Sequence, residues 1–210
     1  MKKKINIVWL KRDLRLQDHE PFLNAENSEL DYLIIYIFEP NMINYGDMSL
    51  IHHQFIYESI SKMNLELKKF KREVLTLYGQ SIDVFKFILT QFEVKKIFTH
   101  QETGIKITWE RDKLIKKFCV NQNINWLDFE TQGVFRGIKN RLNWDKNWYS
   151  YVNGNVIHNK FSNCQIKLNL GKFKLPTKFK IQLAKKSPYL QIAGEEEAFK
   201  KLNSFINERV

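Results

Sequence analysis

Residues 8–19, VWLKRDLRLQDH, join a hydrophobic run to a cluster of charges. The run from Ile5 to Leu10 is largely apolar and partly β-branched, which is typical of a strand buried on both faces. Five charged residues then fall within eight positions: Lys11, Arg12, Asp13, Arg15 and Asp18. The loop contains no glycine, so it holds neither the G-x-G-x-x-G turn of dinucleotide-binding proteins nor a P-loop.

This charged loop allows three interpretations: an internal ion network, a docking surface or an anion site. We favour a network of Arg12, Asp13, Arg15 and Asp18 that fixes the loop and its neighbours. In that network we expect Asp13 to be at least partly buried and paired with an arginine. Asp18 would also cap the helix that follows, with Pro21 in its first turn.

Strand and helix patterns alternate regularly over the first 130 residues. The strand-like runs are residues 5–10, 32–38, 73–78, 94–99 and 124–129. The helical patterns lie between them, near residues 19–27, 50–71, 81–92 and 107–121. This alternation predicts a doubly wound α/β fold, with a five-stranded parallel sheet covered on both faces. Ligands bind such folds outside the carboxyl ends of the strands, and the charged loop lies at one of these ends.

Charge divides the chain into two parts. Residues 1–130 carry 19 Lys and Arg against 18 Asp and Glu, whereas residues 131–210 carry 15 against 5, which accounts for most of the net charge of +11. The hydrophobic content of 43% is sufficient for a normal core. We therefore expect an α/β domain over residues 1–130 and a basic extension over residues 131–210.

The basic extension also contains many aromatic residues, and two interpretations follow. Basic residues interleaved with aromatic ones bind nucleic acid by charge and stacking, and Lys172, Lys174, Lys178 and Lys180 are the candidate DNA or partner surface. Alternatively, the aromatic residues dock the extension onto the first domain or onto a partner. The second interpretation is the more common use of such residues. The aromatic residues concerned are Phe135, Trp144, Trp148, Tyr149, Tyr151, Phe161, Phe173 and Phe179.

Other features indicate a cytoplasmic protein. Cys119 and Cys164 offer no disulfide framework, and Cys119 lies in a helical pattern as a core residue. The N-terminal apolar run is too short for a signal peptide or a membrane span. His52 and His53 are adjacent and point to different helix faces, and His158 is isolated, so we expect no metal site.

Five stretches resemble the DNA photolyase/cryptochrome family. The stretch VWLKRDLRLQDHEPFLNA (8–25) is similar to the opening of these proteins, W-x-R-x-D-L-R-x-x-D followed by Asn or His. HHQFIYESI (52–60), FTHQETGIKITWERD (98–112), QGVFRGIKNRLNWDKNW (132–148) and GEEEAFKKLNSFINER (194–209) resemble later family segments in the same order. The last two resemble the interdomain linker and the helix that leads into the flavin domain.

The resemblance implies an N-terminal, Rossmann-like antenna domain followed by an interdomain linker. In this family a helical C-terminal domain binds FAD and the DNA lesion, and reduced flavin splits pyrimidine dimers in light. We expect FAD only in that domain, which is missing from this chain, so the chain alone would be inactive as a lyase. It would be an excised domain, a truncated product or half of a split protein, with DNA and the FAD domain as partners. The alternatives are a fragment of a cryptochrome-type blue-light sensor and a stand-alone nucleic-acid-binding module.

The resemblance also implies an antenna chromophore of unknown type. In folate-binding members an amide–carboxylate pair follows the fourth strand and would fall at residues 106–108, where neither side-chain type occurs. This makes folate doubtful. The candidate antenna-binding residues are instead His100, Gln101, Glu102 and Thr103, at the carboxyl end of the fourth strand. In the family the charged loop lies near the domain interface, so its ions would hold the sheet edge and the linker together.

Overall fold

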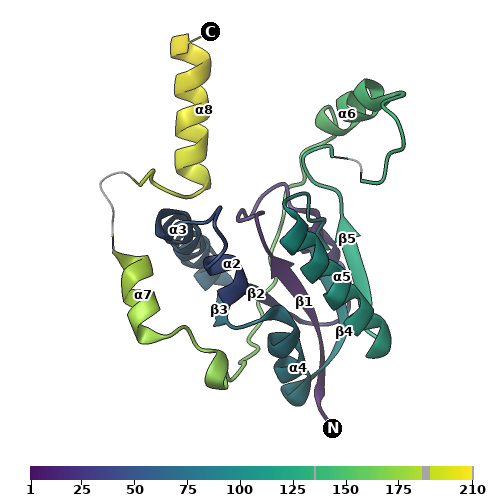
Figure 1. Cartoon of the computed structure of the whole chain (residues 1–210), viewed down its shortest axis with the longest axis vertical. Helices are drawn as coiled ribbons and strands as arrows, with labels where there is room; N and C mark the ends of the chain where they lie inside the picture. Colours follow the sequence, from purple (N-terminus) through teal and green to yellow (C-terminus); the bar gives the residue numbers. More distant parts are fainter. Residues whose placement is uncertain (135, 186–189, 210) are drawn as a thin grey trace.

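A computed structural model describes residues 1–134, 136–185 and 190–209. Five strands form one parallel sheet in the order β3-β2-β1-β4-β5 (Figure 1). The strands are β1 (Lys3–Leu10), β2 (Tyr32–Phe38), β3 (Val74–Tyr78), β4 (Phe92–His100) and β5 (Asn125–Phe129). All five predicted strands are present, and β1 and β4 each begin two residues earlier than the sequence pattern indicated.

Helices cover both faces of the sheet, which confirms the doubly wound α/β prediction. They are α1 (Glu20–Glu26), α2 (Pro40–Ile43), α3 (Leu50–Leu67), the 3-10 turn η1 (Lys68–Phe70), α4 (Ser81–Gln91) and α5 (Lys106–Asn121). On one face, α4 and α5 bury Phe85, Ile88, Ile115 and Cys119. On the other, α1 and α3 bury Phe22, Ile60, Met63 and Leu67. The predicted core position of Cys119 is therefore confirmed, and both cysteines are buried and unpaired.

The central strand β1 determines where the loops meet. From β1 the chain runs outward through β2 and β3, then crosses to β4 and β5 on the other side. Because Val8 of β1 is in register with Phe98 of β4, the loops that leave these two strands emerge side by side. Trp9 is 1% exposed in β1 and packs edge-on against Phe85 and Trp126. The carboxyl ends of the strands face the top of Figure 1.

Beyond β5, the basic extension wraps around the α/β domain. It contains α6 (Trp144–Val152), η2 (Gly171–Phe173), α7 (Thr177–Ala184) and α8 (Glu195–Arg209). Phe161 packs on Phe22, Phe173 on Phe87, and Phe179 on Phe38, with ring centroids 5.2, 5.0 and 5.6 Å apart. The docking interpretation therefore holds for these three rings, while Phe135 lies outside the described residues.

The aromatic residues of α6, unlike these three rings, are largely exposed. Trp144, Tyr149 and Tyr151 are 44, 59 and 39% exposed, and Trp144 stacks on Trp148 within the same helix. In Figure 1, α6 stands above β5 at the carboxyl edge of the sheet. These side chains do not dock the extension onto the α/β domain.

Candidate functional site

A buried carboxylate joins the loops that follow β1 and β4. Asp13 Oδ2 accepts hydrogen bonds from His100 Nδ1 at 2.6 Å and from His19 Nε2 at 2.9 Å. Its Oδ1 accepts the backbone N–H of Lys11 at 2.8 Å. The three side chains are at most 5% exposed. Asp13 is buried as predicted, but the predicted arginine partner is wrong, because two histidines donate to the carboxylate instead.

The hydrogen bonds determine the protonation of this cluster. His19 is the N-cap of α1, and its Nδ1 accepts the N–H of Phe22 at 3.3 Å, so its proton is on Nε2 and points to Asp13. Burial lowers the pKa of His19 despite the neighbouring carboxylate. Burial alone would raise the pKa of Asp13, but the hydrogen bonds from His100 and His19 outweigh it and hold this pKa well below its usual value. The cluster therefore contains an ionised Asp13 and a neutral His19.

Two imidazoles and a carboxylate also form a donor set that can bind a transition metal, and their ligand atoms lie within 4.8 Å of one another. Around tetrahedral zinc, however, neighbouring ligand atoms are about 3.3 Å apart, given metal–ligand distances of about 2.0–2.1 Å. The distances of 2.6 and 2.9 Å are those of hydrogen bonds. In addition, His19 Nε2 carries a proton where a metal needs a lone pair. The geometry fits a structural hydrogen-bond cluster better than a metal site.

Arg111 of α5 is the centre of a second buried network. Its guanidinium lies 3.1 Å from Glu39 after β2, 3.1 Å from Glu102 after β4, and 2.9 Å from Asp112. Lys11 Nζ pairs with Asp112 at 2.7 Å. The sequence interpretation did not include Arg111 or Glu39. The available signal was the spacing of Asp112 in α5, which lies on the same helix face as Thr108, Ile115 and Cys119 and is buried with them.

The other residues of the predicted loop network have separate partners. Arg12 Nε lies 3.1 Å from Glu102, and Arg15 Nη2 lies 4.0 Å from the Asp18 carboxylate. Asp18 does not cap α1, because the adjacent His19 does. Asp18 instead exchanges two hydrogen bonds with the backbone of Ile157 in the extension, through its own N–H and its Oδ1. This loop therefore ties the sheet edge to the extension.

A cavity of about 1040 Å³ opens at the same edge of the sheet. Its walls come from the ends of β1 and β2, from α2 and α3, and from the base of α8. Apolar side chains dominate these walls and include Trp9, Phe38, Met42, Met48, Phe55, Ile56 and Phe199.

The four predicted antenna-binding residues lie beside this cavity rather than at its centre. His100, Gln101 and Thr103 line a small adjoining pocket of about 40 Å³, and Glu102 lines both spaces. His100 and Glu102 are also engaged with Asp13 and Arg111. Sequence reasoning missed the walls formed by α3 and α8, since their apolar residues are indistinguishable in sequence from core positions.

The family model for DNA photolyase matches residues 6–139. The chain belongs to the DNA photolyase family. A deoxyribodipyrimidine photo-lyase of Buchnera aphidicola is 24% identical over 95% of this chain and 44% of its own length.

Two solved structures share the fold of this family member. The Synechocystis cryptochrome matches 99% of this chain and 47% of its own, with a TM-score of 0.75 and 18% identity. The archaeal photolyase of Sulfolobus tokodaii matches 94% and 46%, with a TM-score of 0.70 and 18% identity. The chain thus spans less than half the length of the relatives it matches. In the described ranges, no helix is long and apolar enough to cross a membrane.

Replacing Asp13 tests the buried carboxylate. Asp13→Asn keeps the size of the side chain but presents an amide N–H to an imidazole N–H. We expect the free energy of unfolding, measured by urea denaturation, to fall by about 1–3 kcal/mol, the cost of leaving a buried N–H group without an acceptor. Glu66→Gln is the control, because the Glu66–Lys69 pair is highly exposed and worth about 0–1 kcal/mol. Equal stability of the two variants would contradict the structural role of Asp13.

The low pKa of His19 predicts a loss of stability in acid. Unfolded His19 binds its proton near pH 6.5, whereas the folded protein binds it only at lower pH. Below pH 6.5 the unfolded state therefore holds more protons, and the free energy of unfolding falls by up to about 1.4 kcal/mol per pH unit for one group. His53, whose pKa burial also lowers, adds to this slope.

Urea denaturation at pH 7, 6 and 5 measures the slope. His19→Asn should make it shallower, while His158→Asn, at an exposed position, should leave it unchanged. Identical slopes for the wild type and His19→Asn would show that His19 does not cause the acid sensitivity.

Proposed function

We propose that this chain is the antenna-chromophore domain of a photolyase-like protein and that its cavity binds a planar, light-absorbing ligand. The observation that carries this proposal is the cavity of about 1040 Å³ at the carboxyl edge of a doubly wound sheet. Ligands of such folds bind at this edge, and small-molecule sites are concave and mostly apolar.

The charges around the cavity favour an aromatic ligand over a polyanion. Lys11, Arg12 and Arg111 line the cavity, and each is closely paired with an acid of the protein itself. Arg15 also lines it, and its guanidinium lies 4.0 Å from the Asp18 carboxylate. Their charge is therefore already compensated, and apolar packing remains as the main source of affinity. A fused heteroaromatic ring of flavin size has the apolar area and shape for such packing.

A flavin is also the probe suggested by the relatives. The crystal structure of the Sulfolobus tokodaii photolyase holds two FAD molecules, with the implication of a novel light-harvesting cofactor in that protein. Folate has less support here, because Lys106, Ile107 and Thr108 provide no amide–carboxylate pair. The candidate residues His100, Gln101, Glu102 and Thr103 would contact the polar edge of the ring, next to the small pocket.

Light-driven repair of pyrimidine dimers is the activity we propose for the protein when this domain acts with an FAD-binding domain, in cis or in trans. A blue-light sensor of the cryptochrome type is the alternative, because solved structures of both kinds share the fold. Repair of dimers in light by the chain combined with an FAD domain would distinguish the two. We expect the chain alone to be inactive.

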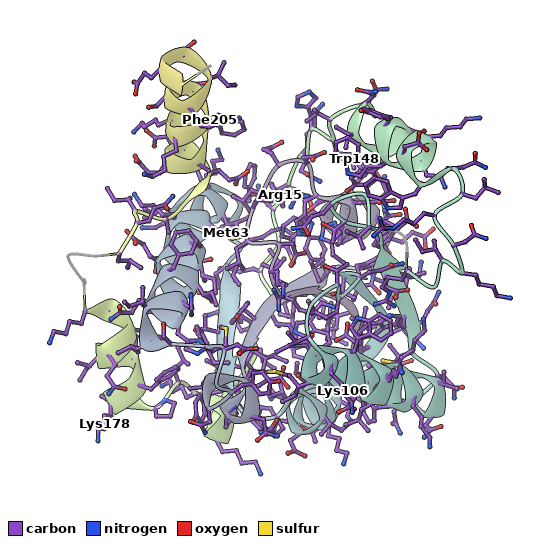
Figure 2. All side chains as sticks on the ribbon, turned by 45° about the horizontal axis from the view of Figure 1, so that its top comes forward. Arg15, Met63, Lys106, Trp148, Lys178 and Phe205 are labelled. Carbon is purple, nitrogen blue, oxygen red and sulfur yellow. The ribbon has the colours of Figure 1, made fainter. Side chains whose placement is uncertain are left out.

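A second candidate function is weak binding to nucleic acid. Lys172 and Lys174 flank Phe173 in and after η2, and Lys178 and Lys180 lie on α7. All four are exposed, and no Asp or Glu occurs between Asp145 and Glu195. Figure 2 shows Lys178 pointing away from the body. An uncompensated row of lysines attracts phosphate groups without reading their sequence.

Flavin binding tests the cavity. Riboflavin fluorescence should be quenched on titration with the purified chain. Met48 lines the cavity, and Met48→Trp fills part of it, so the Kd should rise about tenfold or more, which corresponds to a cost of about 1.4 kcal/mol or more for the added volume. Leu65→Trp, at a 70% exposed position on α3, is the control. Equal affinity of the two variants would place the ligand elsewhere, and no binding of any flavin would contradict a flavin antenna.

Salt dependence tests the lysine surface. Binding to a labelled DNA duplex should be weak and should fall steeply between about 50 and 200 mM salt, because each neutralised phosphate releases counterions. Changing Lys172, Lys174, Lys178 and Lys180 together to Glu should abolish it. The control makes the same charge change at four exposed lysines of α5: Lys106, Lys113, Lys116 and Lys117. Equal loss in both variants would indicate a net-charge effect and not a defined surface.

A further inference from the structure

A contact distant in sequence joins the first loop to the last helix. Glu195 is the first residue of α8, and its carboxylate accepts the backbone N–H groups of Leu16 at 2.7 Å and Gln17 at 3.2 Å. These amides belong to the charged loop that leaves β1. A carboxylate that accepts two N–H groups makes charge-assisted hydrogen bonds. A negative charge in the first turn of a helix also interacts favourably with the helix dipole.

The residues around Glu195 fix the entry into α8. Ala193 is buried at 1% exposure. Gly194 has φ of +106°, and a Cβ there would lie 3.3 Å from the Lys62 side chain on α3, so both the conformation and the space favour glycine. The chain therefore turns tightly against α3 immediately before the glutamate that contacts the loop.

The base of α8 forms part of the cavity. Gly194, Glu195, Ala198, Phe199 and Leu202 all line it. Further along, Phe205 and Ile206 are 53 and 52% exposed, and Figures 1 and 2 show this part of α8 standing clear of the body. Only the first half of the helix is thus in a position to contact a ligand, and the Glu195 contact sits at its lower end.

The neighbouring acids do not share this contact. Glu196 and Glu197 both pair with Lys200 of the same helix, at 2.7 and 2.8 Å. These pairs lie within α8 and do not connect it to the loop. Glu195 and Glu196 therefore form a matched pair of adjacent glutamates, of which one links α8 to the α/β domain.

We propose that Glu195 is a positioning residue that clamps α8 against the charged loop, so that α8 becomes a wall of the cavity and its docking is coupled to ligand binding. The coupling to a ligand rests on the proposed function, whereas the docking of α8 by Glu195 does not. A ligand that touches the docked helix stabilises the docked state, and by linkage docking raises its affinity to the same degree. When the contact of Glu195 is weakened, a smaller fraction of the molecules has α8 docked, and the apparent affinity for the ligand falls in proportion to that fraction.

The full chain with Glu195→Gln tests the clamp. The glutamine has the same size, but it has no charge and only one acceptor oxygen for two N–H groups. Without ligand, hydrogen–deuterium exchange should become faster at the amides of Leu16 and Gln17 and in the first turn of α8. Glu196→Gln, which makes the same chemical change one residue later, should leave these amides unchanged.

Riboflavin titration of the same variants tests the coupling. We expect Glu195→Gln to raise the Kd about tenfold, which corresponds to a docked fraction of roughly one tenth, and Glu196→Gln to leave it unchanged. Faster exchange with an unchanged Kd would overturn the coupling. Unchanged exchange would overturn the clamp itself. If the wild type binds no flavin, the flavin proposal fails, and with it the coupling to this ligand, while exchange still decides whether the clamp exists.

Discussion

The ionised carboxylate of Asp13 is the constraint around which the carboxyl edge of the sheet is organised. A buried charge has to be solvated by the protein, and here two imidazoles and a backbone amide replace water. These donors come from the loop after β1, the cap of α1 and the end of β4. Satisfying one carboxylate thus fixes three segments relative to one another, and neighbouring Glu102 and Lys11 then lie where the Arg111 network can engage them.

The α/β fold was predictable because its pattern is local. Apolar runs such as 32–38 are buried strands in the structure, and the helical pattern near residues 50–71 is α3, which buries Ile60, Met63 and Leu67. The partners of the charged loop were not predictable in this way. Asp13 and His100 are 87 positions apart, so nothing in the local sequence shows that a histidine, and not an arginine, reaches this carboxylate. The resemblance supplied the family, which periodicity alone did not.

The cavity was even harder to predict from the sequence than the partners of the charged loop. Met48, Phe55 and Phe199 are ordinary apolar residues in sequence, and they become a wall only after α3 and α8 meet at the edge of the sheet. The predicted antenna-binding residues after β4 lie close to the cavity because the end of a strand can be recognised in the sequence and the cavity opens at the strand ends. The docking interpretation of the extension holds for aromatic rings that meet a partner ring in the α/β domain, as Phe161 and Phe173 do. The exposed rings of α6 carry the same sequence signature without the same contact.

The position of Trp9 has an optical consequence. Trp9 is buried in β1 and lines the cavity, whereas Trp144 is exposed on α6. A flavin bound in the cavity would lie near Trp9 and would absorb where tryptophan emits, so the excited indole would transfer its energy to the flavin. The protein thus contains its own donor fluorophore at the cavity. The fluorescence of Trp9 in the central strand β1 would therefore fall when the cavity is filled.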